Sequence, residues 1–159
     1  MTKELSPSAR KVQEALDSTG VSCRVLELEI SARTAAEAAE AVGCQVGQIV
    51  KSLIFTGKES GNPILALVSG KNRVDEKLLE AACGEAVGKA DAAFVRERTG
   101  FAIGGIPPLG HAEPLCPLID RDLLEYPEVW AAAGTPHALF RITPADLLAV
   151  TNGRLATLS

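Results

Sequence analysis

Three features of the 159-residue sequence predict an α+β domain built on a mixed or largely antiparallel sheet. The composition is that of a folded chain, because 47% of the residues are apolar and the net charge is only −4. No repeat or Pro/Ser-rich linker divides the chain, so residues 1–159 are treated as one domain. Helical and strand patterns alternate irregularly, unlike a doubly wound sheet. We expect a curved, barrel-like sheet surrounded by helices.

Five segments have helical patterns with recognisable ends. Ser6 and Pro7 suit an N-cap and a first helical residue, and Thr34 with Glu37 forms a capping box. The predicted helices begin at Ser6–Pro7, Thr34, Asp75, Asp91 and Pro144, and end near Gly20, Gly43, Cys83, Arg98 and Asn152–Gly153.

Five other segments have strand patterns, rich in β-branched and apolar residues. The predicted strands are Val21–Ile30, Ile49–Phe55, Ile64–Ser69, Leu115–Ile119 and Ala138–Thr143. The turn Gly57–Pro63 connects the second and third of these strands.

Charge and hydropathy exclude several classes of protein. The longest charge-free stretch, Thr99–Ala112, is too short for a membrane span and contains four glycines and two prolines. Early charges at Lys3 and Glu4 argue against a signal peptide, so we expect a cytoplasmic protein. The acidic balance argues against DNA binding and against any tight binding of nucleic acid by bulk charge.

No metal or cofactor is expected. The four cysteines form no Cys-x-x-Cys pair and are interpreted as reduced thiols, and the only histidines are His111 and His137. The phosphate-binding loop, the dinucleotide fingerprint, the hydrolase nucleophile elbow and the zinc-protease helix are all absent.

Lys51 is the first candidate functional residue. Strand alternation places it on one face with Ile49, Leu53 and Phe55. An ammonium on an apolar face either extends past its neighbours to solvent or faces an anion or carbonyl oxygen at the mouth of a pocket. The strand pattern alone leaves both interpretations open.

The glycine-rich segment Thr99–His111 is the second candidate. Its glycines permit close backbone approach, so it is either a structural turn or a rigid loop whose amides hold a small polar group. His111 is interpreted as lining a pocket. Ser69, in the turn Ser69–Arg73, is a further candidate for ligand contact, and the segment Gly134–His137 is another turn.

Three motifs together resemble the YbaK/prolyl-tRNA editing-domain family: Ile49–Leu53, Gly100–His111 and Gly134–Thr135 occur in the family's order. The resemblance extends from the first helix to Leu147. It implies a mixed α/β fold around a curved sheet. It also implies an enzyme that hydrolyses the ester between a wrong amino acid and the 3′ end of a tRNA.

The resemblance also implies roles for individual residues. Lys51 would be the catalytic lysine near the terminal adenosine, and Gly104 and Gly105 would hold the aminoacyl group. Gly110 and His111 would complete the wall of the pocket that holds the aminoacyl group. Three further candidate substrate-binding residues are Ser69, Gly134 and Thr135.

An activated ester needs positioning and charge stabilisation more than a protein nucleophile, and the family's mechanisms resemble substrate-assisted hydrolysis through the 2′-hydroxyl of the terminal ribose.

Leu139 stands where cysteine-directed branches of the family carry an acidic residue, which argues against a cysteinyl-tRNA substrate. The expected pocket is apolar and suits small side chains such as alanine or serine. Its expected walls are Ile49, Leu53, Ile103, Ala138 and Leu139. The expected substrate is a small mischarged amino acid of the Ala, Ser or Cys class on tRNA(Pro) or a related tRNA, and the Leu139 position disfavours Cys within that class.

The expected partner is the acceptor end of aminoacyl-tRNA, bound transiently, with an aminoacyl-tRNA synthetase as a second candidate partner. A local excess of cations supports this contact: Lys51, Lys58, Lys71, Arg73 and Lys77. Two alternatives stay open, a non-catalytic module that binds aminoacyl-tRNA or a synthetase, and a binder of amino-acid-like small molecules.

Overall fold

Eight strands form one mixed sheet in the computed structural model, which describes residues 4–159. The strands are β1 (Leu26–Glu27), β2 (Ile49–Gly57), β3 (Pro63–Ser69), β4 (Val87–Lys89), β5 (Leu118–Asp120), β6 (Val129–Ala132), β7 (Ala138–Ile142) and β8 (Arg154–Ala156). Their order is β1-β7-β6-β2-β3-β5-β8, and β4 pairs with β2 outside this path.

The sheet is open, so the expectation of a barrel-like sheet is wrong. The strands at its two ends, β1 and β8, do not pair with each other. The β2–β6, β3–β5 and β5–β8 pairs are parallel, whereas β2–β3, β2–β4, β6–β7 and β1–β7 are antiparallel. The prediction of a mixed sheet in an α+β domain is confirmed.

The five predicted helices are all present, with bounds close to those expected. They are α1 (Pro7–Ser18), α2 (Ala35–Val42), α3 (Glu76–Cys83), α4 (Ala92–Thr99) and α5 (Pro144–Thr151), and two short 3₁₀ helices lie at Val46–Gln48 and Arg121–Glu125. Ser6 caps α1, and the Thr34–Glu37 capping box forms at α2. Between residues 4 and 159, no helix combines the length and apolarity that crossing a membrane requires.

The predicted strand Val21–Ile30 is wrong over most of its length. Only Leu26 and Glu27 pair with β7, because the side chain of Gln13 in α1 hydrogen-bonds to the backbone of the preceding residues. Its side chain donates to the Cys23 carbonyl at 2.9 Å and accepts from the Val25 amide at 2.7 Å. A side chain therefore satisfies groups that a neighbouring strand would otherwise bind.

The other differences concern short strands. The segment predicted at Leu115–Ile119 forms β5 from Leu118 onward, after Pro117, which has no amide to donate. Strands β4, β6 and β8 were not predicted. They have three or four residues each, too few to show an alternating pattern.

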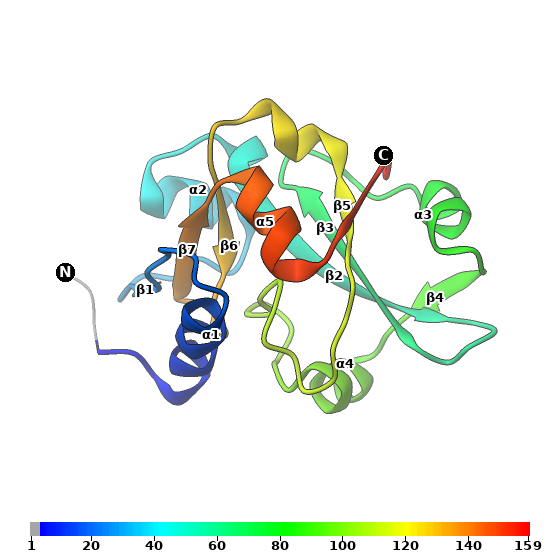
Figure 1. Cartoon of the computed structure of the whole chain (residues 1–159), viewed down its shortest axis with the longest axis horizontal. Coiled ribbons are helices and arrows are strands. Elements are labelled where there is room, and N and C mark those ends of the chain that lie inside the picture. Colours follow the sequence, from blue (N-terminus) through cyan, green and yellow to red (C-terminus); the bar gives the residue numbers. More distant parts are fainter. Residues whose placement is uncertain (1–3) are drawn as a thin grey trace.

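Helices cover both faces of the sheet. The larger core packs α1, α4 and α5 with the loop after α4 against one face, through residues such as Val12, Val95, Ile106 and Leu147. On the other face, Leu79 of α3 packs on β3, while Ala38 and Ala39 of α2 pack on Ile49. In Figure 1 the β2–β3 hairpin extends toward α3 and β4, away from α1 and β7.

The turn after β6 anchors the glycine-rich loop. The amide of Gly134 donates to the Gly105 carbonyl at 2.8 Å, and Thr135 Oγ1 donates to Glu27 at 3.2 Å. Glu27 is buried and also accepts the Ser6 amide at 2.7 Å. One carboxylate therefore ties the start of α1 to the turn that supports the loop.

Gly134→Ala is expected to destabilise the fold by about 3 kcal/mol. Gly134 has φ +101°, and a Cβ there would lie 2.7 Å from the Ser8 carbonyl oxygen. Thermal unfolding should show a Tm lowered by roughly 6–12 °C. The control is Gly61→Ala, which has φ +72° but open space around its Cβ, and should cost about 1 kcal/mol. Equal losses in the two variants would contradict the close contact.

Candidate functional site

Strand β2 pairs with one strand along its whole first edge, whereas pairing along its second edge is interrupted. Along the first edge, β3 pairs with residues 50–56. On the second edge, β6 pairs with Ile49 and Val50, and β4 pairs with residues 55–57. Residues 51–54 therefore have no neighbouring strand on this edge, and the sheet has a gap there.

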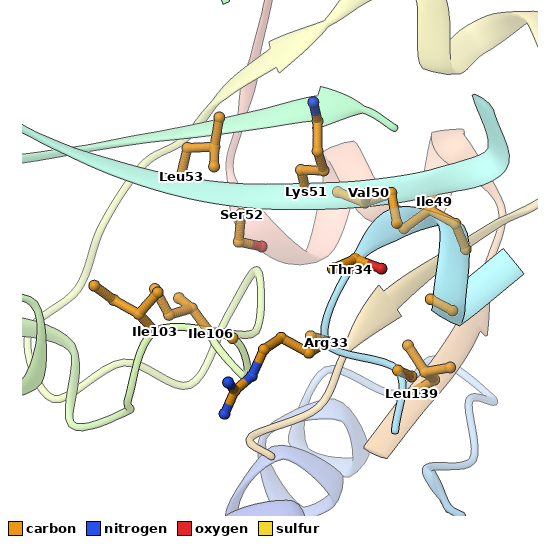
Figure 2. Close-up of a pocket in the computed structure, with 15 residues that line it drawn as sticks. Arg33, Thr34, Ile49, Val50, Lys51, Ser52, Leu53, Ile103, Ile106 and Leu139 are labelled. Atoms are coloured by element: carbon orange, nitrogen blue, oxygen red, sulfur yellow. The ribbon is translucent and has the colours of Figure 1, made fainter. Parts of the chain in front are cut away.

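A cavity of about 510 Å³ lies at this gap (Figure 2). Its walls come from the segment before α2, from α2 itself, from β2, from the glycine-rich loop and from β6 and β7. The lining residues are Ala32, Arg33, Thr34, Ala35, Ala38, Ile49, Val50, Lys51, Ser52, Leu53, Ile103, Gly104, Ile106, Ala132 and Leu139. Most of these side chains are apolar, so the few polar groups stand out.

Lys51 lines the cavity, but its ammonium is held on the outer side of β2. Figure 2 shows its side chain on the opposite side of the strand from Ser52 and Ile106. The ammonium donates to the Asn72 backbone carbonyl. Partial burial lowers the pKa of Lys51, and the neighbouring Asp120 carboxylate opposes that shift.

A buried carboxylate organises the segment that holds Lys51. Asp120 accepts the Ser69 amide at 3.0 Å and the Asn72 side-chain amide at 2.9 Å. The Ser69 hydroxyl donates to the Gly47 carbonyl at 2.7 Å. Ser69 is fully buried and does not line the cavity, contrary to the expectation of a ligand contact. It ties β3 to the 3₁₀ helix Val46–Gln48 before β2 instead.

The glycine-rich loop contributes Ile103, Gly104 and Ile106 to the cavity. Gly104 has φ +99°, and a Cβ there would lie 3.3 Å from Nε of Arg33, so the arginine side chain lies against the bare backbone. Ile103 is 56% exposed at the rim. Gly105 lies behind this surface, where a Cβ would be 2.8 Å from the Thr135 backbone.

Gly134, Thr135 and Gly105 therefore support the loop without lining the cavity. Ala138, expected as a wall residue, is buried and does not line it either, whereas Ile49, Leu53, Ile103 and Leu139 do.

Gly110 and His111 lie elsewhere. They line a separate cavity of about 310 Å³ with residues around Cys116 and Val150, so the expectation that they complete the wall beside Lys51 is wrong. The positive φ of Gly110 turns the chain away after Pro108. His111 Nε2 lies 2.7 Å from the Pro107 carbonyl oxygen, and burial lowers its pKa. Its contacts are those of a packing residue.

The cavity contains no side chain that could act as a strong nucleophile or general base. None of its 15 lining residues is His, Cys, Asp or Glu. Over residues 4–159, no group of such side chains is arranged to hold a metal ion. Chemistry at this site must rely on positioning, backbone groups, hydroxyls and the two cations, Lys51 and Arg33.

Sequence reasoning missed Arg33, Thr34, Ser52 and Ile106 as cavity residues. Ser52 carries a readable signal, because it stands between Val50 and Ile54 on the strand face that packs into the larger core. Arg33 has no comparable signal. It lies in a loop before α2, and only the fold brings it to Gly104.

Comparison with known proteins agrees with this architecture. A solved structure described as "a putative trans-editing enzyme for prolyl tRNA synthetase" has 55% identity and a TM-score of 0.93, with 98% of this chain and 99% of that chain covered. The Bacillus subtilis protein YwhH is 32% identical over 123 residues, which is 77% of this chain and 78% of YwhH.

A third relative is "Putative Cys-tRNA(Pro)/Cys-tRNA(Cys) deacylase EbsC" from Enterococcus faecalis. It is 26% identical over 127 residues, 79% of this chain and 77% of EbsC. The model of the aminoacyl-tRNA editing domain matches residues 29–150, which include β2, the glycine-rich loop and every residue of the cavity. The chain therefore belongs to the aminoacyl-tRNA editing domain family, and its activity class is aminoacyl-tRNA deacylation.

Proposed function

We propose that this chain is a trans-editing deacylase that removes a small mischarged amino acid, of the Ala, Ser or Cys class, from tRNA(Pro) or a related tRNA. The observation that carries the proposal is the apolar cavity at the gap in the sheet, with two cations beside it and no side-chain nucleophile. A pocket of this kind suits a substrate that is already activated and needs only to be held.

The chemistry follows from the groups present. An aminoacyl ester reacts with water once it is oriented and the developing negative charge is stabilised. The backbone amide of Gly104 is a donor at this site. The ammonium of Lys51 becomes a second donor when it leaves the Asn72 carbonyl and turns toward the cavity. With no carboxylate or imidazole on the cavity, the 2′-hydroxyl of the terminal ribose is the group available to orient the attacking water.

The walls support a small side chain. Ile49, Leu53, Ile103 and Leu139 enclose the cavity with branched apolar groups. Leu139 offers no carboxylate to a polar substrate, which favours alanine within the proposed class. Synthetases separate such side chains by only about 1–3 kcal/mol, so a second hydrolytic site is useful.

Two cations suit contact with the acceptor end alone. Of the five cations between Lys51 and Lys77, only Lys51 lines the cavity, and Lys71 is paired with Glu125 at 3.0 Å. Arg33 adds a second cation at the rim. The tRNA phosphates therefore meet few positive charges, and binding should be weak and reversible.

Wild-type protein should release amino acid from at least one of Ala-, Ser- and Cys-tRNA(Pro), and Lys51→Met should lower kcat/KM about 100-fold, as expected on loss of a charged stabilising group. Methionine keeps the apolar stem, so Tm should change little. The measurement is release of labelled amino acid, and Lys77→Met on exposed α3 is the matched control. Retained tRNA binding without turnover would instead favour a non-catalytic binding module.

Arg33→Ala should raise KM about tenfold with little change in kcat, because the arginine lies at the rim and one phosphate contact would be lost. The slope of log(kcat/KM) against log[salt] should become shallower by about 1. Arg24→Ala, an exposed arginine away from this cavity, should leave the slope unchanged. An unaltered slope in Arg33→Ala would contradict the phosphate contact.

A further inference from the structure

The hydroxyl of Ser52 is a polar group with no partner. Its Oγ is buried and makes no hydrogen bond to any residue from 4 to 159. The neighbours at alternate positions on this side of β2, Val50 and Ile54, both belong to the larger apolar core or pack against it. An unpaired buried hydroxyl costs about 1–3 kcal/mol, so its place here needs a reason other than stability.

The backbone of Ser52 also faces the gap. The Gly57 amide donates to the Asn62 carbonyl at 2.9 Å, and the Gly70 amide donates to the Ile49 carbonyl at 2.7 Å. These two bonds show that odd-numbered residues of β2 direct their backbone groups toward β3. On the opposite edge, the Lys58 amide donates to the Ala86 carbonyl at 2.8 Å, so even-numbered residues face that edge.

It follows that the N–H and C=O of Ser52 point into the interruption between β6 and β4, where no strand pairs with them. Figure 2 shows the Ser52 side chain on the side of β2 that faces Ile103 and Ile106. The backbone of Ser52 thus offers a donor and an acceptor to a cavity whose other walls are mostly apolar, and the unpartnered, buried hydroxyl lies beside them.

We propose that Ser52 is a substrate-binding residue that holds the polar atoms of the aminoacyl group at the unpaired edge of β2. An aminoacyl ester carries an α-ammonium, which needs acceptors, and an ester carbonyl, which needs donors. The carbonyl and Oγ of Ser52 accept from the ammonium, and its N–H donates to the ester carbonyl. This assignment rests on the proposed function.

Ser52 acts here by binding and not as a nucleophile. No His, Asp or Glu lines the cavity to accept its proton, so the hydroxyl stays protonated. Its position beside the ester orients the carbonyl for water. The specificity that follows is for the common backbone of an α-amino acid, whereas the apolar walls select the side chain.

The test uses two readouts on the full chain. The first is deacylation of Ala-, Ser- and Cys-tRNA(Pro), and the second is binding of a stable amide analogue, 3′-alanylamino-3′-deoxyadenosine, by calorimetry. Ser52→Ala should lower kcat/KM about tenfold and weaken analogue binding about tenfold, the loss of one hydrogen bond to a charged group. Its Tm should be unchanged or higher, because an unpartnered hydroxyl is removed.

Two variants serve as controls. Ser52→Thr keeps the hydroxyl and should stay within about threefold of wild type in binding, a factor worth less than one hydrogen bond. Thr56→Ala removes a hydroxyl from the same side of β2, where β4 pairs with the strand and outside the lining of this cavity, and should change neither readout.

Each outcome decides between the two proposals. Wild-type turnover with Ser52→Ala equal to wild type would overturn the Ser52 assignment and leave the deacylase intact. Analogue binding that depends on Ser52, without turnover of any tRNA, would overturn the deacylase and support Ser52. Absence of both turnover and Ser52-dependent binding would overturn both. A lowered Tm in Ser52→Ala that matches its loss of binding would assign Ser52 a structural role and also overturn its assignment.

Discussion

The gap beside β2 is the constraint on which the site depends. Strands β6 and β4 share one edge of β2 without meeting, so the sheet opens over residues 51–54 while β3 keeps the strand extended along its other edge. A sheet edge exposes backbone donors and acceptors. Here α2 and the glycine-rich loop flank that edge, and they convert it from a site of strand pairing into the wall of a cavity.

Two buried carboxylates hold the segments around this gap in place. Glu27 joins the start of α1 to Thr135, whose turn supports Gly105. Asp120 gathers Ser69 and Asn72, and the Asn72 carbonyl receives the ammonium of Lys51. Hydrogen bonds to carboxylates are stronger than neutral ones, so Glu27 fixes the chain just before α1, and Asp120 fixes the end of β3 and the turn that follows it. The cavity is therefore shaped by residues that never touch it.

Helices and strands whose sequence signals lie within the segment itself could be predicted, and those determined by contacts with distant residues could not. Capping residues such as Ser6 and Thr34 mark helix starts because the cap lies within the segment itself. The strand predicted before β1 does not form, because the side chain of Gln13, ten residues before Cys23, hydrogen-bonds to the backbone there. Strand alternation and glycine clustering made Lys51 and the segment Thr99–His111 candidates, and the roles of Lys51 and Gly104 came from the family resemblance. His111 was misplaced because its sequence distance from Gly104 says nothing of the turn at Gly110.

An acidic surface is consistent with this chemistry. A net charge of −4 disfavours extended contact with a polyanion, and the cations at the cavity are limited to Lys51 and Arg33. An editing enzyme encounters mostly correct aminoacyl-tRNA, so tight binding through phosphates would hold the wrong partners. Selection has to come from the aminoacyl group itself, through apolar walls that limit its size and an open strand edge that recognises its polar atoms. The weak attraction to tRNA phosphates and the selective cavity therefore act together to discriminate mischarged from correct aminoacyl-tRNA.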